Sequence, residues 1–250
     1  MWTSTRRSGA AHATRSREVG VAVAVLACVG LAACTSAGAP SPASTAEADT
    51  VAPFPERGKI EAGTYLVTGY PVPFEITVPD GADGWETFDG TALGKDDPDY
   101  PNSWNAAVTF WAANYVPTDA CAWRGKLVQI DRTAEALVDA MTTQASAVTT
   151  PPVEVVVGDY SGFEFDYAVA SDVDVASCDD GKFCLNSDSA ETCNARTYET
   201  ADGHETWLVV DLNGERAEIQ VGRSHDAIDP ALTREARAIF DSIEFIRPDE

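Results

Sequence analysis

The chain has few basic residues and few histidines. Seventeen Lys and Arg stand against 40 Asp and Glu among 250 residues, which gives a formal net charge of −23 at pH 7. Proteins that bind nucleic acid neutralise phosphates with Lys and Arg, so this balance excludes nucleic acid as a partner. Only three histidines are present, so the side chain most often used for acid–base catalysis is scarce.

Long apolar segments are also missing. The longest uncharged apolar stretch, residues 19–33, has fifteen residues and would span roughly 22 Å as a helix. A membrane-spanning helix needs about 20 residues, so a transmembrane anchor is disfavoured. Four arginines precede the stretch and small residues end it, which is typical of a secretory signal. Arg6-Arg7 lacks the hydrophobic pair of a twin-arginine signal, which favours the general secretory route.

The signal ends in Leu31-Ala32-Ala33-Cys34. This run resembles the lipobox of bacterial lipoproteins, and the resemblance implies that the Cys34 thiol receives a diacylglyceryl group before cleavage after residue 33. Cys28 lies inside the apolar stretch and would leave with residues 1–33. Because two acyl chains anchor a protein far more stably than one, we expect a protein tethered to the extracytoplasmic face of the cell membrane.

Residues 34–56 read as the lipidated N-terminus and a flexible tether, because Ser, Ala, Thr and Pro dominate them and such segments bury too little apolar surface to fold. Residues 57–250 are long enough for one domain. Without residues 1–33 the chain retains 13 basic and 39 acidic residues, a net charge of −26. A domain with this negative charge should be soluble and should not bind anionic lipid headgroups.

Four further cysteines remain: Cys121, Cys178, Cys184 and Cys193. An even number in an exported chain implies two disulfides, and four cysteines allow three connectivities. We favour Cys121–Cys178 with Cys184–Cys193, in which the second bond closes a short polar loop. The spacings do not match those of zinc sites, so we predict no metal and no cofactor.

The hydrophobic pattern predicts an α+β fold, an antiparallel sheet with two main helices packed on it. One helix starts after the N-cap Thr133 and stops before Pro151, and the other starts at Asp229-Pro230. Asn213-Gly214 predicts a hairpin. Residues 170–193 read as an acidic loop. Strands are expected at 73–78, 106–114, 127–130, 153–157, 162–169, 196–200, 206–212, 216–221 and 244–246. The strand at 196–200 is expected to pair with the strand at 206–212 across Asp202-Gly203.

Several short motifs occur in a specific order: Gly63-Thr64-Tyr65, Phe74-Glu75-Ile76-Thr77-Val78-Pro79, Ala120-Cys121-Ala122-Trp123, Gly158-Asp159-Tyr160-Ser161-Gly162, Trp207-Leu208-Val209-Val210-Asp211 and Asp241-Ser242-Ile243-Glu244-Phe245. Together they resemble uncharacterised secreted lipoproteins of actinobacteria. The element order resembles the Mog1/PsbP-like sandwich, as in mycobacterial lipoproteins of the LpqN type. Cys184 to Cys193 departs from it and looks like an insertion. The resemblance implies no catalytic residues and no particular substrate.

Few residues are candidates for catalysis. Ser161, in a motif one residue off a nucleophile elbow, could pair with His204 or His225 in a hydrolase. Ser224-His225-Asp226 has the letters of a triad, but neighbours in sequence cannot line up as nucleophile, base and orienting acid. Two acidic clusters could bind calcium through hard oxygen ligands, although neither fits an EF-hand; they are Asp96, Asp97 and Asp99, and Asp172, Asp174, Asp179 and Asp180.

Aromatic residues gather before the first helix, namely Tyr100, Trp104, Trp111, Tyr115 and Trp123. We expect most to be core and one or two to form a binding patch. The sequence therefore predicts a monomeric, non-catalytic binding or interaction domain whose ligand is an envelope protein, a glycan or a small apolar molecule. The alternatives are an envelope-acting hydrolase and a tethered structural module without a dedicated ligand.

Overall fold

The computed structural model describes residues 51–99, 105–224 and 228–247. The predicted signal sequence, Cys34 and most of the predicted tether lie outside the described residues, as do Tyr100, Trp104 and His225. The described residues all fall in one compact unit that begins at Glu47. No helix among them is long and apolar enough to cross a membrane.

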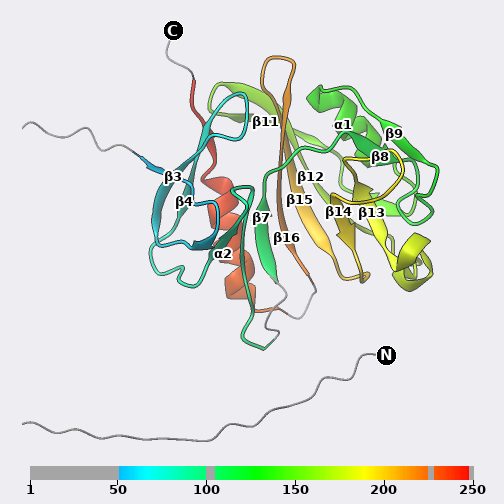
Figure 1. Ribbon diagram of the computed structural model, residues 1–250, viewed down its shortest axis with the longest axis horizontal. Coiled ribbons are helices and arrows are strands. Elements are labelled where there is room, and N and C mark those ends of the chain that lie inside the picture. Colours follow the sequence, from blue (N-terminus) through cyan, green and yellow to red (C-terminus); the bar gives the residue numbers. More distant parts are fainter. Residues whose placement is uncertain (1–50, 100–104, 225–227, 248–250) are drawn as a thin grey trace, which may run out of the picture. The chain divides into compact units, whose positions relative to one another are not determined.

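A large antiparallel sheet forms the centre of the domain (Figure 1). Its strand order is β10 (Ala147–Thr149), β12 (Tyr160–Val169), β15 (His204–Asp211), β16 (Arg216–Arg223), β7 (Ala106–Thr109), β6 (Ala92–Lys95), β5 (Glu86–Phe88) and β2 (Gly58–Lys59). Strand β11 (Val153–Val157) pairs with the first half of β12, and β10 pairs with its last residues. The predicted Asn213-Gly214 hairpin joins β15 to β16, and both of its turn residues have the positive φ that such turns require.

Three smaller sheets flank the large one. The first contains β1 (Ala52–Pro53), β3 (Gly63–Val67), β4 (Phe74–Val78) and β17 (Glu244–Phe245), and the two-stranded ones pair β8 (Tyr115–Pro117) with β9 (Leu127–Gln129) and β13 (Phe183–Asn186) with β14 (Arg196–Tyr198). Strand β1 lies inside the predicted tether. The folded part therefore starts before Arg57, because β1 pairs in parallel with β3 and the Phe54 ring packs 5.2 Å from that of Phe110.

Antiparallel strands dominate the described chain, and it contains two α-helices, α1 (Ala134–Thr142) and α2 (Pro230–Asp241). Both start as the sequence predicts, since the side chains of Thr133 and Asp229 accept hydrogen bonds from Ala136 N and Ala231 N. Helix α1 stops at Thr142, well before Pro151, because β10 occupies the intervening segment.

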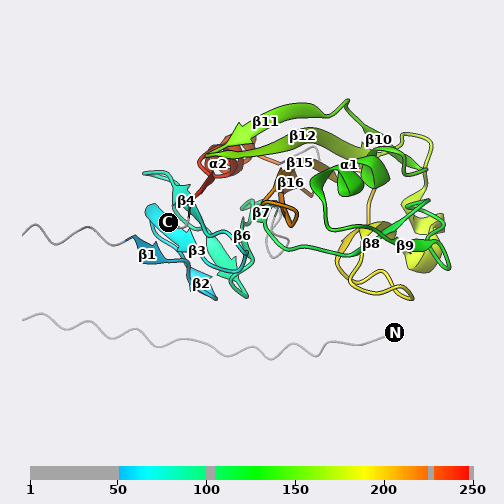
Figure 2. The same ribbon diagram turned by 90° about the horizontal axis from the view of Figure 1, so that it is seen from above.

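The helices lie on opposite faces of the central sheet (Figures 1 and 2). One core, which we call the α2 core, packs Leu232, Ile239 and Phe240 against Val108, Ile219 and other residues of one face. The other, the α1 core, packs Leu137 and Met141 against Phe165, Tyr167 and Trp207 of the opposite face. The aromatic residues of β12 are thus core, as the alternation predicts.

Two disulfides link segments on the α1 side, Cys121–Cys178 and Cys184–Cys193, which is the pairing favoured from the sequence. Two other expectations there were wrong. Residues 170–193 are more than a loop, because they contain two 3₁₀ turns and the fully buried strand β13. Residues 196–198 do not pair with β15 across Asp202-Gly203, because β13 is the partner of β14 and β12 and β16 occupy both edges of β15.

Candidate functional site

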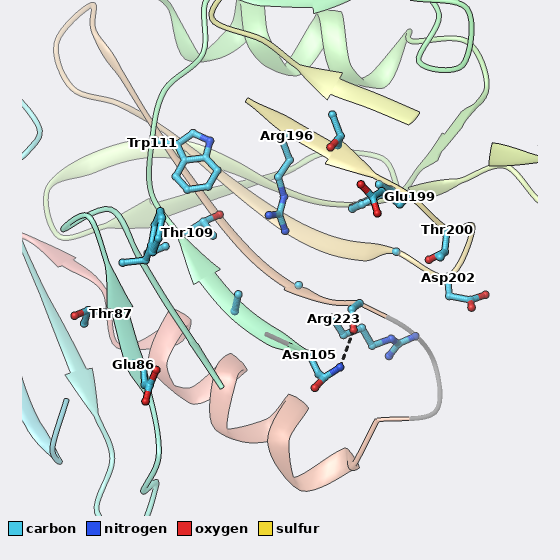
Figure 3. A pocket seen from close by; sticks show the side chains of 18 of the residues that line it. Glu86, Thr87, Asn105, Thr109, Trp111, Arg196, Glu199, Thr200, Asp202 and Arg223 are labelled. Carbon is cyan, nitrogen blue, oxygen red and sulfur yellow. Dashed lines mark hydrogen bonds between the residues drawn. The ribbon is translucent and has the colours of Figure 1, made fainter. Parts of the chain in front are cut away.

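An open groove of about 990 Å³ lies between strand β14 and the β2–β5 end of the central sheet. Figure 3 shows Arg196, Glu199 and Asp202 along one side, Glu86 on the opposite side and Trp111 at one end. The volume is at the upper end of the range typical of ligand pockets. We call this site the β14 groove.

The floor of the β14 groove is made of small side chains on neighbouring strands. Ala107 on β7 is paired with Gly222 on β16, and Thr109 on β7 is paired with Ala92 on β6. A Cβ atom at Gly222 would lie 2.6 Å from Cγ of Glu205, so a larger residue there would displace the Glu205 side chain. Small residues at these positions leave space above the sheet that a ligand can fill.

A buried ion pair connects the wall of the groove to the central sheet. The Arg196 Nε donates to Glu205 Oε1 at 2.5 Å, and a second guanidinium nitrogen donates to the same oxygen. Glu205 is fully buried, whereas the Arg196 side chain keeps 23% exposure. Burial would lower the pKa of Arg196, but the Glu205 carboxylate raises it above its usual value. Arg196 is therefore a fixed, charged group at the edge of the groove.

Tyr198 also belongs to this wall, and its ring covers Gly203. Burial and then the Glu205 carboxylate raise the pKa of Tyr198 well above its usual value. A phenol whose pKa is raised in this way stays protonated and acts as a hydrogen-bond donor rather than as a base.

One face of β16 carries a row of buried polar residues, Arg216, Glu218 and Gln220, which leads to Gly222 in the floor. The Arg216 Nε donates to Glu218 Oε1 at 2.7 Å, and the Glu218 carboxylate also accepts from Ala113 N and Asn186 Nδ2. Burial raises the pKa of Glu218 to about 7, although Arg216 opposes the shift. This row holds β13 and the β7–β8 connection against the sheet.

The Gln220 side chain lies close to the floor of the β14 groove and holds an amide donor without a partner among the described residues. Its Oε1 accepts from Thr109 Oγ1 at 2.5 Å, and Thr109 lines the groove. Its Nε2 is buried and has no hydrogen-bond partner in the described part of the chain. A buried amide without a partner is costly, so an ordered water or a local strain is needed to explain it.

The charges on the rim are not balanced within the groove. Arg57 pairs with Asp89 at 2.6 Å and Arg196 pairs with Glu205. The exposed carboxylates of Glu86, Glu199 and Asp202 form no ion pair or hydrogen bond with the described residues. The groove therefore presents three carboxylates without partners to solvent, while a third arginine, Arg223, also lies in its lining.

The structure separates the candidate catalytic residues. Ser161 lies near the start of β12, while His204 is paired with Ala168 near its end. Seven residues of strand separate the two positions, or roughly 23 Å at about 3.3 Å per residue. Ser161 and His204 therefore cannot act as nucleophile and base together, and His225 lies outside the described residues.

The acidic clusters form structural contacts. The Asp97 carboxylate accepts from Asp99 N and Asp229 N, so it links its own turn to the start of α2. In the second cluster, Asp174 caps a 3₁₀ turn and Asp180 pairs with Arg124. Among the described residues no group of three or more His, Cys, Asp or Glu could hold a metal ion.

Three of the five aromatic residues expected near the first helix lie in the described part of the chain; Trp123 is buried, and Trp111 and Tyr115 are half-buried. The Trp123 Nε1 donates to Asp179 O and Lys182 O. Trp111 lines the β14 groove. The sequence pointed to Trp111 but missed Arg196, Tyr198 and Glu205. The only signal for Glu205 was a charged residue at an inward position, two residues before the buried Trp207.

No family model matches this sequence, and a search of curated proteins finds no significant match.

Proposed function

We propose that this protein is a lipid-anchored extracytoplasmic lipoprotein whose folded domain binds a ligand in the β14 groove without transforming it. The lipobox and tether support the anchor, and the two disulfides are typical of a chain that folds in an oxidising compartment. An antiparallel sheet with a helix on each face also supports a relationship to the Mog1/PsbP-like fold.

The observation that carries the binding proposal is the groove itself. It combines an aromatic side chain, Trp111, with a floor of small residues and with rim carboxylates that lack partners among the described residues, such as Glu199 and Asp202. Ligand sites typically have such a mixture of apolar surface and few convergent polar groups.

Fractionation of cells tests the anchor. Cys34→Ala should move the protein from the membrane to the soluble fraction and leave it unacylated by mass spectrometry, because no thiol would remain at the cleavage site. Cys28→Ala is the matched control and should behave as the wild type. Membrane retention of Cys34→Ala at unchanged mass would contradict the proposal.

Native mass spectrometry of the protein extracted from its own membranes tests binding. The wild type should retain a non-covalent ligand that Trp111→Ala loses. Val156→Ala is the control, since Val156 is 72% exposed on β11 outside the groove. A ligand retained equally by Trp111→Ala, or a bare protein in every preparation, would refute a role for the groove.

A further inference from the structure

We propose that the β14 groove binds an extended, positively charged peptide segment that adds as a strand to the free edge of β14. This inference rests on the proposed function, because it assumes that the groove is the binding site. It specifies the class of ligand, a basic segment of another polypeptide, and the way in which the site recognises it.

The first support is the unpaired strand edge. Within the described residues β14 hydrogen-bonds only to β13, and residues 196–200 line the groove (Figure 3). In an antiparallel pair, alternate residues of an edge strand direct N–H and C=O away from the partner. An extended peptide can pair with these groups, which is how several peptide-binding domains recognise their ligands.

The strand is held in place for such pairing. Arg196 is fixed by Glu205 of β15, the Tyr198 ring lies against Gly203, and the Cys184–Cys193 disulfide connects β13 to the segment just before β14. A pre-organised edge loses little conformational freedom when a peptide binds, so more of the interaction energy appears as affinity.

The second support is charge complementarity. Glu199 and Asp202 lie at the end of β14 and the turn that follows it, and neither has a partner among the described residues. Glu86 faces them across the groove, although Lys59 is its cross-strand neighbour. Of the three arginines that line the groove, Arg57 pairs with Asp89, Arg196 pairs with Glu205, and Arg223 is also engaged by a neighbouring group. A ligand with Lys or Arg side chains would therefore be favoured over a neutral or acidic one.

The third support is the arrangement of the side chains around this edge. Successive residues of an extended peptide point to opposite sides. One set would reach the floor of small residues, Ala92, Ala107 and Gly222, and could contact Trp111. The other set would point to solvent, within reach of the carboxylates at the rim. A neutral glycan could stack on Trp111, but it would leave the edge of β14 and the carboxylates unused.

Selection from a display library of random peptides of about ten residues, with the full-length protein as bait, tests the proposal. The selected peptides should be enriched in Lys and Arg and should bind about tenfold more weakly when salt is raised, because exposed charges are screened. Failure to select any peptide, or selection without a bias toward basic residues, would overturn the proposal.

Backbone methylation of a selected peptide tests strand addition itself. Methylating one alternate set of amides should weaken binding about tenfold, because these N–H groups would pair with β14, and methylating the other set should have little effect. Equal effects of the two sets would show that the peptide does not bind as a strand.

Charge-neutralising variants test the position of the peptide. Glu199→Gln with Asp202→Asn should weaken binding roughly fivefold. Asp172→Asn with Glu191→Gln removes the same charge from exposed positions outside the groove and should leave affinity unchanged. Equal losses in the two double variants would refute a specific role for the rim.

A neutral oligosaccharide of N-acetylglucosamine serves as the competing probe. If the oligosaccharide binds and Trp111→Ala abolishes its binding while no peptide is selected, the peptide inference fails and the proposed binding function stands. If neither a peptide nor the oligosaccharide binds and native mass spectrometry finds no ligand that depends on Trp111, both fail.

Discussion

The two faces of the central sheet carry different side chains, apolar on one and partly polar on the other, although the same strands supply both. On β16, Ala217, Ile219 and Val221 point into the α2 core, whereas Arg216, Glu218 and Gln220 point to the opposite face. The α2 face is closed by a helix and a second sheet. The opposite face is closed over β12 and β15 by α1, and between β14 and the β2–β5 end it is left open as the β14 groove.

This difference shows how a small domain can keep a closed core on one face of a sheet and an open groove on the other. The α2 core buries apolar side chains drawn from Ile60 to Phe245, and burial of this kind is the main source of folding free energy. The groove face replaces part of that burial with hydrogen bonds, two buried ion pairs and disulfides, which fix its walls without filling the space between them.

The disulfides give the largest expected difference between the faces. Cys121→Ser with Cys178→Ser should lower the free energy of unfolding by about 4 kcal/mol, and Cys184→Ser with Cys193→Ser by about 3 kcal/mol, because the longer loop restricts the unfolded chain more. Denaturant unfolding measures both. Hydrogen exchange in the first double variant should increase in β8, β9 and α1 before it increases in α2. An equal increase in α2 would contradict separate stabilisation of the two faces.

Ile219→Ala probes the closed face. Ile219 is fully buried, and truncation of such a side chain costs about 3 kcal/mol from lost burial and the cavity that remains. Below the unfolding temperature, its affinity for a groove ligand should match that of the wild type. A loss of affinity in the folded variant would show that the two faces are coupled.

Glu218 makes the stability of the groove face depend on pH. Its pKa in the folded protein is about 7, above the usual value of 4.5, so the folded state binds the proton more tightly than the unfolded state. The stabilisation from this residue is complete below pH 4.5 and is lost as pH rises through 7. Between pH 5 and 8 the wild type should therefore lose stability relative to Glu218→Gln.

Urea unfolding of both proteins at a series of pH values measures that difference. Asp188→Asn is a suitable control, because Asp188 is exposed and its charge contributes to the raised pKa of Glu218 only as the last of several causes. A difference between wild type and Glu218→Gln that stays constant over this pH range would refute the raised pKa.

The smallest effect on stability is expected at the open groove. Trp111→Ala should lower the free energy of unfolding by about 2 kcal/mol, less than Ile219→Ala, because Trp111 is only half-buried and its truncation beside an open groove leaves no closed cavity. The same variant should weaken the binding of the selected peptides, because it removes the aromatic surface at one end of the groove. A large loss of stability would show that Trp111 contributes to the core rather than mainly to the groove.

The sequence predicted correctly those helix starts and turns that depend on a few neighbouring residues. Thr133, Asp229 and the Asn213-Gly214 turn mark ends that depend on a few neighbouring residues, and all lie where expected. The partner of β14 was missed, because antiparallel pairing depends on which strands meet, and β12 and β16 already occupy both edges of β15.

The β14 groove was harder to predict than the fold. The alternation of Arg216, Glu218 and Gln220 with apolar residues reads as a strand with one solvated face, because polar residues at period two usually face water. Those residues are buried instead, since Asn186 of β13 and Ala113 cover them. That cover comes from distant segments, and so does the wall that Arg196 and Tyr198 form.

The early start of the folded part affects how mechanical load enters the molecule. In a chain held at Cys34, tension from the membrane would first reach β1, whose residues pair with β3, and then Phe54, which packs beside Phe110 and donates its N–H to Leu66 O. Arg57 and Gly58, the first residues of the groove rim, follow only three residues later. In a chain anchored in this way, strand β1 and Phe54 would take up tension before it reached the proposed binding site.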